Sequence, residues 1–155
     1  MQDHPSREPD LAIADLRVWV HERAIPDATD YWDGNWLRAT ARCQSPGAAV
    51  EVTGTILHLS EVAFLLNGCE AMHRTLSGAA RLACIEPNLK AELEIDHLGH
   101  LAVTIEITPD HMTERHQFRC SLDQTHLDPI IAGCRQILEK YPMRERERLP
   151  KERQA

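Results

Sequence analysis

The chain has 155 residues and a mass of 17.6 kDa, which suits one domain with a single core. Its 43% hydrophobic and 26% charged residues, without an apolar run near the roughly 18 residues of a membrane helix, exclude a disordered or membrane-spanning chain. The formal charge of −7 argues against binding to DNA or RNA, which requires lysine and arginine patches, and favours a basic partner. The polar start Met1–Pro5 does not resemble a secretory signal, so we expect a cytoplasmic location.

Acidic residues are concentrated in the body of the chain. The segment Met143–Ala155 has five basic and three acidic residues, whereas the rest of the chain has 12 basic and 21 acidic ones. Arginine and glutamate alternate from Arg144 to Arg148 without any apolar period. We therefore predict a single domain over residues 1–142 and a charged, disordered tail over residues 143–155.

Alternation of apolar and polar residues predicts three strands before the first helix. These strands span residues 14–21, 36–43 and 50–56. The turn sequence Ser45-Pro46-Gly47 joins the second and third strands as a hairpin. Helical spacing of apolar residues then predicts a helix with Ser60 as its N-cap and Gly78 at its end.

Four strands and a second helix are predicted in the rest of the chain. The strands span residues 80–84, 89–95, 101–107 and 116–122, and the helix runs from its N-cap Asp128 to Pro142. A three-residue turn with Gly99 in the left-handed conformation puts Ile95 opposite Leu101 and Lys90 opposite Glu106. The fold class is therefore α+β, a mostly antiparallel sheet of about seven strands in the order βββαββββα with two packed helices.

The five cysteines include no C-x-x-C pair, which excludes zinc ribbons and dithiol redox motifs. Each cysteine falls in the apolar phase of its segment. We therefore expect reduced thiols that serve as small core side chains in a cytosolic protein.

Signatures of catalysis and metal binding are absent from the sequence. Nucleophile-elbow, P-loop and dinucleotide-binding motifs do not occur. His97 and His100, beside Asp96, could ligate zinc, but they lie at a predicted hairpin tip without a fourth ligand. Three glutamates on neighbouring strands are interpreted as a solvated sheet face rather than a glycosidase pair: Glu92, Glu94 and Glu106. We predict no catalytic residue, metal or cofactor.

The segment from Asp30 to Trp36 is unusual because three of the seven aromatic residues lie within it, mixed with carboxylates. As a binding site for a basic protein partner, it would use Asp30, Tyr31, Trp32, Asp33 and Asn35. As a structural element, Trp36 would instead fill the core while Asp33 and Asn35 shape the loop through hydrogen bonds. The sequence leaves both interpretations open, with Trp32 the side chain that we most expect to be exposed.

Three motifs are distinctive: Asp30-Tyr-Trp-Asp-Gly-Asn-Trp-Leu37, Asp96-x-x-Gly99-His100 and Leu122-Asp-Gln-Thr-His-Leu127. Together they resemble the WapI-type immunity proteins of bacterial polymorphic toxin systems. The resemblance spans residues 30–127 and implies a small cytosolic protein that binds and blocks a cognate toxin domain. The acidic body would then fit a basic toxin surface, for example the phosphate-binding cleft of a nuclease.

Two other classes of function stay open. An enzyme or small-ligand binder would need a pocket near Asp33 and His100 with convergent polar groups. A self-assembling structural module would form a homodimer through an uncovered strand edge or helix stripe. The prediction we place first is a non-catalytic cytosolic immunity protein that binds a protein partner.

Overall fold

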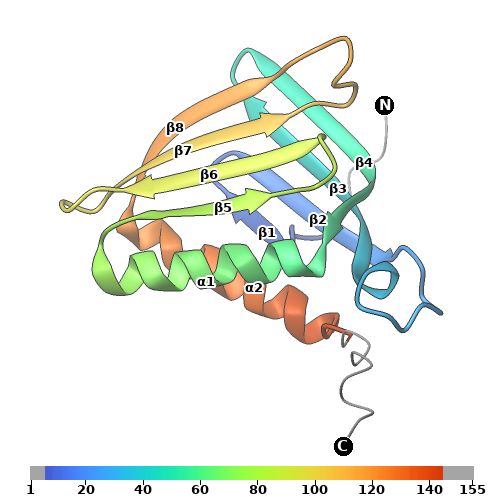
Figure 1. Ribbon diagram of the computed structural model, residues 1–155. Helices are drawn as coiled ribbons and strands as arrows, with labels where there is room; N and C mark the ends of the chain where they lie inside the picture. Colours follow the sequence, from blue (N-terminus) through green and yellow to red (C-terminus); the bar gives the residue numbers. More distant parts are fainter. Residues whose placement is uncertain (1–5, 145–155) are drawn as a thin grey trace, which may run out of the picture.

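The chain folds into two antiparallel sheets of four strands and two helices, as shown by a computed structural model that describes residues 6–144 (Figure 1). The first sheet contains, in spatial order, β1 (Leu11–Ile13), β2 (Leu16–Arg23), β3 (Trp36–Ser45) and β4 (Ala48–His58). The second contains β5 (Ala79–Ala83), β6 (Leu89–Ile95), β7 (His100–Ile107) and β8 (Gln117–Asp123). The helices are α1 (Leu59–Thr75) and α2 (Leu127–Lys140), with short 3-10 helices η1 (Asp33–Asn35) and η2 (Gln124–His126).

The core lies between the two sheets and is closed along one side by the helices. Helix α1 runs from the end of β4 to the start of β5, and α2 packs beside it against β1 (Figure 1). Alternate residues of β3, β6 and β7 point into the core, as the period of two requires. Buried core residues of these strands and of α1 include Leu37, Ala39, Ala41, Leu93, Ile95, Val103, Ile105, Val62, Leu65 and Met72.

The α+β class, the antiparallel pairing and the two packed helices are confirmed; where about seven strands were predicted, the structure has eight, divided between two sheets of four. The missed strand, β1, has only three residues, too few to display an alternating pattern. Its turn into β2 passes through Ala14 at a φ of 54°, without the glycine or asparagine that usually marks such a turn. The four strands before α1 form one sheet and the four strands after it form the other.

Both predicted N-caps are also corrected. Helix α1 begins at Leu59 with His58 as its N-cap, because the His58 side chain accepts the backbone N–H of Ser60. Helix α2 continues directly from η2, so Asp128 lies in its first turn. The aspartate that caps this region is Asp123, which accepts the N–H of Thr125 at 2.9 Å.

The five thiols are free, and three of them lie in the core as expected. Burial raises the pKa of Cys43 to about 11 and those of Cys69 and Cys134 to about 12. Cys84 and Cys120 are only partly buried. Among the described residues, neither helix is long and apolar enough to cross a membrane.

The predicted register of the central hairpin is confirmed in full. Ile95 pairs with Leu101 and Lys90 with Glu106, and Gly99 has a φ of +83°. Any slip by one residue would place the charged face of β6 against the core.

Replacing Gly99 with alanine is expected to lower the free energy of unfolding by about 1–2 kcal/mol, because a Cβ is disfavoured at positive φ. Urea denaturation followed by circular dichroism measures the change. Gly47, in the β3–β4 turn, is the matched control, since a Cβ there meets nothing within 4 Å and its φ is not positive. Its alanine variant should stay within about 0.5 kcal/mol of the wild type; an equal loss at both positions would contradict the assigned turn.

Candidate functional site

The aromatic and acidic segment lies in the connection between β2 and β3, at one end of the molecule beside the start of α1 (Figure 1). Three of its rings surround the imidazole of His58. The ring centroids of Trp32 and Trp36 each lie 5.0 Å from that of His58, and the centroid of Tyr31 lies 5.7 Å away. The last residue of β4 therefore forms the centre of an aromatic cluster.

His58 is fully buried and fixes the backbone of this segment. Its Nδ1 accepts the Ser60 N–H at 3.2 Å and lies 2.7 Å from the Ser60 hydroxyl. The ring proton therefore sits on Nε2, which donates to the Trp32 carbonyl oxygen at 3.0 Å. The buried His58 ring therefore has hydrogen-bond partners at both nitrogens.

Asn35 ties the same segment to the end of the described chain. Its buried amide donates to the carbonyl oxygens of Tyr31, at 2.7 Å, and Arg144, at 3.0 Å, and accepts the Arg144 N–H at 2.8 Å. The Arg144 guanidinium donates to the carbonyl of Ala28. We call residues 142–144 the C-terminal strap, because hydrogen bonds attach them to the connection between β2 and β3.

The strap includes Met143 and Arg144, the first two residues of the predicted tail; residues 145–155, for which the composition predicts disorder, lie outside the described part of the chain. Arg23 adds a second attachment by donating to the carbonyls of Gly34, at 2.7 Å, and Pro142. The loop is therefore held at two places: by His58, next to the start of α1, and by the C-terminal strap.

Of the five predicted site residues, some shape the loop and others are exposed on its surface. Asn35 is buried, and Asp30 is half-buried with its carboxylate accepting the Asp33 N–H at 2.9 Å, so these two shape the loop. Tyr31 is half-buried against His58. Trp32 is 49% exposed, as expected, and the exposed Asp33 side chain bonds to no other residue within 6–144.

Trp36 does not fill the core. It is half-buried and packs against His58 and edge-on against Trp32, with a centroid separation of 5.8 Å between the two tryptophans. Trp36 opens β3 at the end of the sheet, so its ring lies beyond the interior between the sheets. The Trp36 ring therefore supports the exposed ring of Trp32.

Glu61, in the first turn of α1, connects this cluster to the β5–β6 connection. One carboxylate oxygen accepts the His58 N–H at 2.7 Å and the other accepts the Ile85 N–H, also at 2.7 Å. Burial raises the pKa of Glu61, although both backbone N–H groups oppose that shift by favouring the carboxylate. Sequence patterns contain no sign of this bridge, because Glu61 and Ile85 are 24 positions apart.

Asp33 and His100 do not share a pocket. The β6–β7 turn and the β2–β3 connection lie at opposite ends of the molecule (Figure 1). In that turn, one oxygen of Asp96 accepts the N–H groups of Leu98 and His100, and the other lies 3.1 Å from His100 Nδ1. The proposed ligand pocket near Asp33 and His100 is thus wrong, and Asp96 shapes its turn.

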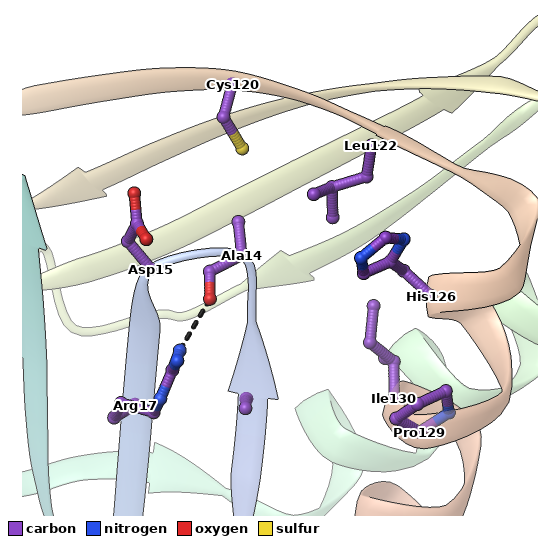
Figure 2. Close-up of a pocket in the computed structure, with 9 residues that line it drawn as sticks. Ala14, Asp15, Arg17, Cys120, Leu122, His126, Pro129 and Ile130 are labelled. Atoms are coloured by element: carbon purple, nitrogen blue, oxygen red, sulfur yellow. Dashed lines mark hydrogen bonds between the residues drawn. The ribbon is translucent and has the colours of Figure 1, made fainter.

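A cleft of about 360 Å³ lies elsewhere, between the β1–β2 turn, β8 and the start of α2 (Figure 2). Burial, aided by the charge of Asp15, raises the pKa of Cys120, so this thiol is protonated at neutral pH and is a poor nucleophile. Arg17 donates to the Ala14 carbonyl, and His126 Nδ1 lies 3.4 Å from a carboxylate oxygen of Asp123. The cleft therefore presents no activated nucleophile.

The three sheet glutamates lie on an outer face that no helix covers (Figure 1). Glu92 lies 3.2 Å from the Lys90 ammonium and 3.7 Å from Arg81, and Glu106 lies 3.1 Å from Arg115. These pairs are typical of a solvated face, as predicted. Within residues 6–144, no group of three or more His, Cys, Asp or Glu side chains is placed to hold a metal ion.

Comparisons with known proteins give one match. No curated protein and no solved structure matches the chain. A model of the "Immunity protein WapI-like family" matches residues 10–142, which include every strand and both helices of the described part of the chain. The chain therefore belongs to the WapI-like immunity protein family, in agreement with the resemblance of its motifs.

Proposed function

We propose that this chain is a cytoplasmic immunity protein that neutralises a cognate toxin domain by binding it directly, without catalysis. Membership of the WapI-like family supports the class of function. The observation that carries the binding mode is the half-exposed Trp32 ring, which packs against Trp36 and His58 and whose backbone carbonyl accepts a hydrogen bond from His58.

Tryptophan is among the side chains that contribute most to protein interfaces, because a single ring removes a large apolar area from water. Binding is tighter when little conformational freedom is lost. Here His58 holds the Trp32 backbone and Trp36 supports its ring before any partner arrives. The loop is thus preorganised to present Trp32.

The negative charge of this chain indicates what kind of partner to expect. The chain carries a formal charge of −7, and the Asp33 carboxylate next to Trp32 has no ion-pair partner among the described residues. A positively charged toxin domain would be attracted over a distance of about one Debye length, roughly 8 Å at physiological salt. We therefore expect a basic toxin surface.

Replacing Trp32 with alanine is expected to weaken binding to the toxin domain at least 30-fold, about 2 kcal/mol, with little change in melting temperature. The probe is the C-terminal domain of a candidate toxin from the same genome, inactivated by mutation for biolayer interferometry. The active domain serves for growth rescue in cells. Met112→Ala is the matched control, since Met112 is 79% exposed in the β7–β8 connection, and it should bind like the wild type.

The same assay distinguishes the parts of the proposal. Unchanged binding of the Trp32 variant would contradict the contact, and wild-type protein that neither binds nor protects would contradict the immunity function. The association rate should fall as sodium chloride increases, because salt screens the attraction. A rate insensitive to salt would contradict a basic partner.

A further inference from the structure

Three of the exposed apolar side chains gather around the first two turns of α1. They are Trp32, Phe64, which is 62% exposed on α1, and Ile85, which is 58% exposed in the β5–β6 connection. We call these three residues the α1 patch. Figure 1 shows the start of α1, the β2–β3 connection and the β5–β6 connection at the same end of the molecule.

Hydrogen bonds tie Trp32 and Ile85 to the start of α1, the helix that carries Phe64. Trp32 is joined to His58 through its carbonyl, and His58 and Ile85 donate their N–H groups to the same Glu61 carboxylate. Phe64 lies three residues after Glu61 on α1, so the two side chains are neighbours on the helix surface. The backbones of Trp32 and Ile85 are therefore both tied to the start of α1, Ile85 through Glu61 and Trp32 through His58.

A groove continues the patch past Phe64, between α1 and β5. It has a volume of about 530 Å³, and three of its lining residues are small: Gly68, Ala79 and Ala80. A Cβ at Gly68 would lie only 2.8 Å from the Cβ of Ala80, so helix and strand are in direct contact below the groove. The groove gives an apolar partner side chain a place beside Phe64.

Unpaired carboxylates flank the patch. The side chains of Asp33, beside Trp32, and Glu86, beside Ile85, form no hydrogen bond or ion pair with other described residues. Arg23 and Arg144 donate to backbone carbonyls of the loop, and Arg81, which lines the groove, lies 3.7 Å from Glu92. Two carboxylates without a cationic partner, those of Asp33 and Glu86, therefore lie next to the patch, and one cation, Arg81, lines its groove.

We propose that the α1 patch is one continuous docking surface for the toxin domain, an inference that rests on the proposed function. Its occupant is a toxin-domain surface with apolar side chains at the centre and lysine or arginine side chains around them. Trp32 and Ile85 make the central contacts, Phe64 and its groove extend them along α1, and Asp33 and Glu86 meet the cations. Apolar centres with charged borders are typical of specific protein interfaces.

The test uses serine substitutions at exposed positions on and off the patch. Ile85→Ser and Phe64→Ser are expected to weaken binding to the inactivated toxin domain at least 10-fold. The matched controls are Leu98→Ser in the β6–β7 turn and Met112→Ser, which remove exposed side chains at other places and should stay within twofold of the wild type. Glu86→Lys should slow association, whereas Glu94→Lys, on the outer face of β6, should not.

The possible outcomes separate the docking surface from the immunity function. Loss of binding in the patch variants alone supports the proposal. If Trp32→Ala weakens binding but both serine variants bind like the wild type, the extended surface is wrong while the immunity function stands. Wild-type protein that does not bind the toxin domain overturns both. Light scattering that shows a dimer of the free protein, dissociated by Ile85→Ser, would assign the patch to a second copy and also overturn the proposal.

Discussion

Replacing Asn35 with alanine is expected to lower the free energy of unfolding by about 3–4 kcal/mol and to detach the C-terminal strap. The side chain is fully buried and makes three hydrogen bonds, to Tyr31 and to both backbone groups of Arg144. Each bond contributes about 1 kcal/mol, and a buried polar group left without a partner costs about 1–3 kcal/mol. Water can reach the strap once it opens, so the unpaired Tyr31 carbonyl accounts for most of the added cost.

Denaturant unfolding measures the loss of stability, and amide hydrogen exchange at Arg144, followed by NMR, measures release of the strap. Asn88→Ala is the matched control, because Asn88 also donates its amide to two carbonyls, of Thr108 at 3.0 Å and Pro109 at 3.2 Å, but is only half-buried. It should cost about 1 kcal/mol and leave Arg144 exchange unchanged.

Asn35→Asp separates the hydrogen-bond requirement from side-chain volume. An ionised carboxylate of the same shape cannot donate to the carbonyls of Tyr31 and Arg144, so it should destabilise the protein at pH 7 at least as much as alanine does. Wild-type stability in the aspartate variant would contradict the role of the amide as a donor. Toxin binding should weaken in both variants, because the Trp32 loop loses its rear support.

Local patterns predict most of the fold because its strands are covered on one face. In β6 and β7 every second residue is apolar, so only one pairing register keeps the charged side chains out of the core. The structure has that register. The short strand β1 has no comparable pattern, and its turn through Ala14 uses a residue that does not mark turns. Pattern-based prediction therefore fails where an element is too short to have a period.

The candidate site is only partly predictable, because contacts between distant residues assemble it. Composition alone identifies the segment around Trp32 as unusual and predicts that Trp32 is exposed. The partners that hold that segment are 26 positions away in His58 and 109 positions away in Arg144. Neither residue belongs to a motif of the segment, and Arg144 falls in a stretch whose composition suggests disorder. Hydrogen bonds to the backbone leave no sequence signature in their acceptors.

Replacing Glu61 with glutamine is expected to lower the free energy of unfolding by about 2–3 kcal/mol and to loosen the β5–β6 connection. A carboxylate accepts two N–H groups, from His58 and Ile85, whereas an amide can accept only one and turns its own NH₂ towards the other. The expected loss of free energy has two sources. A buried N–H donor is left without an acceptor, and a charged acceptor is lost. Amide exchange at Ile85 should accelerate.

The same variant reports the titration of Glu61. Its pKa in the folded protein is raised above the usual 4.5, so between the two values the folded protein holds more protons than the unfolded chain. The contribution of this group to stability is therefore fully present below pH 4.5 and falls as pH rises through the raised pKa. The stability difference between wild type and Glu61→Gln should shrink from acidic to neutral pH; a difference that grows would contradict burial as the dominant cause.

The matched control for Glu61 is Glu70→Gln on the same helix. Glu70 is half-buried and lies 3.6 Å from the exposed Arg135, so its loss should cost no more than about 0.5 kcal/mol at any pH. In the toxin-binding assay, Glu61→Gln should weaken binding through Ile85, since the carboxylate holds that residue beside Trp32. Glu70→Gln should bind like the wild type. Equal effects of the two substitutions on binding would show that Glu61 does not position the α1 patch.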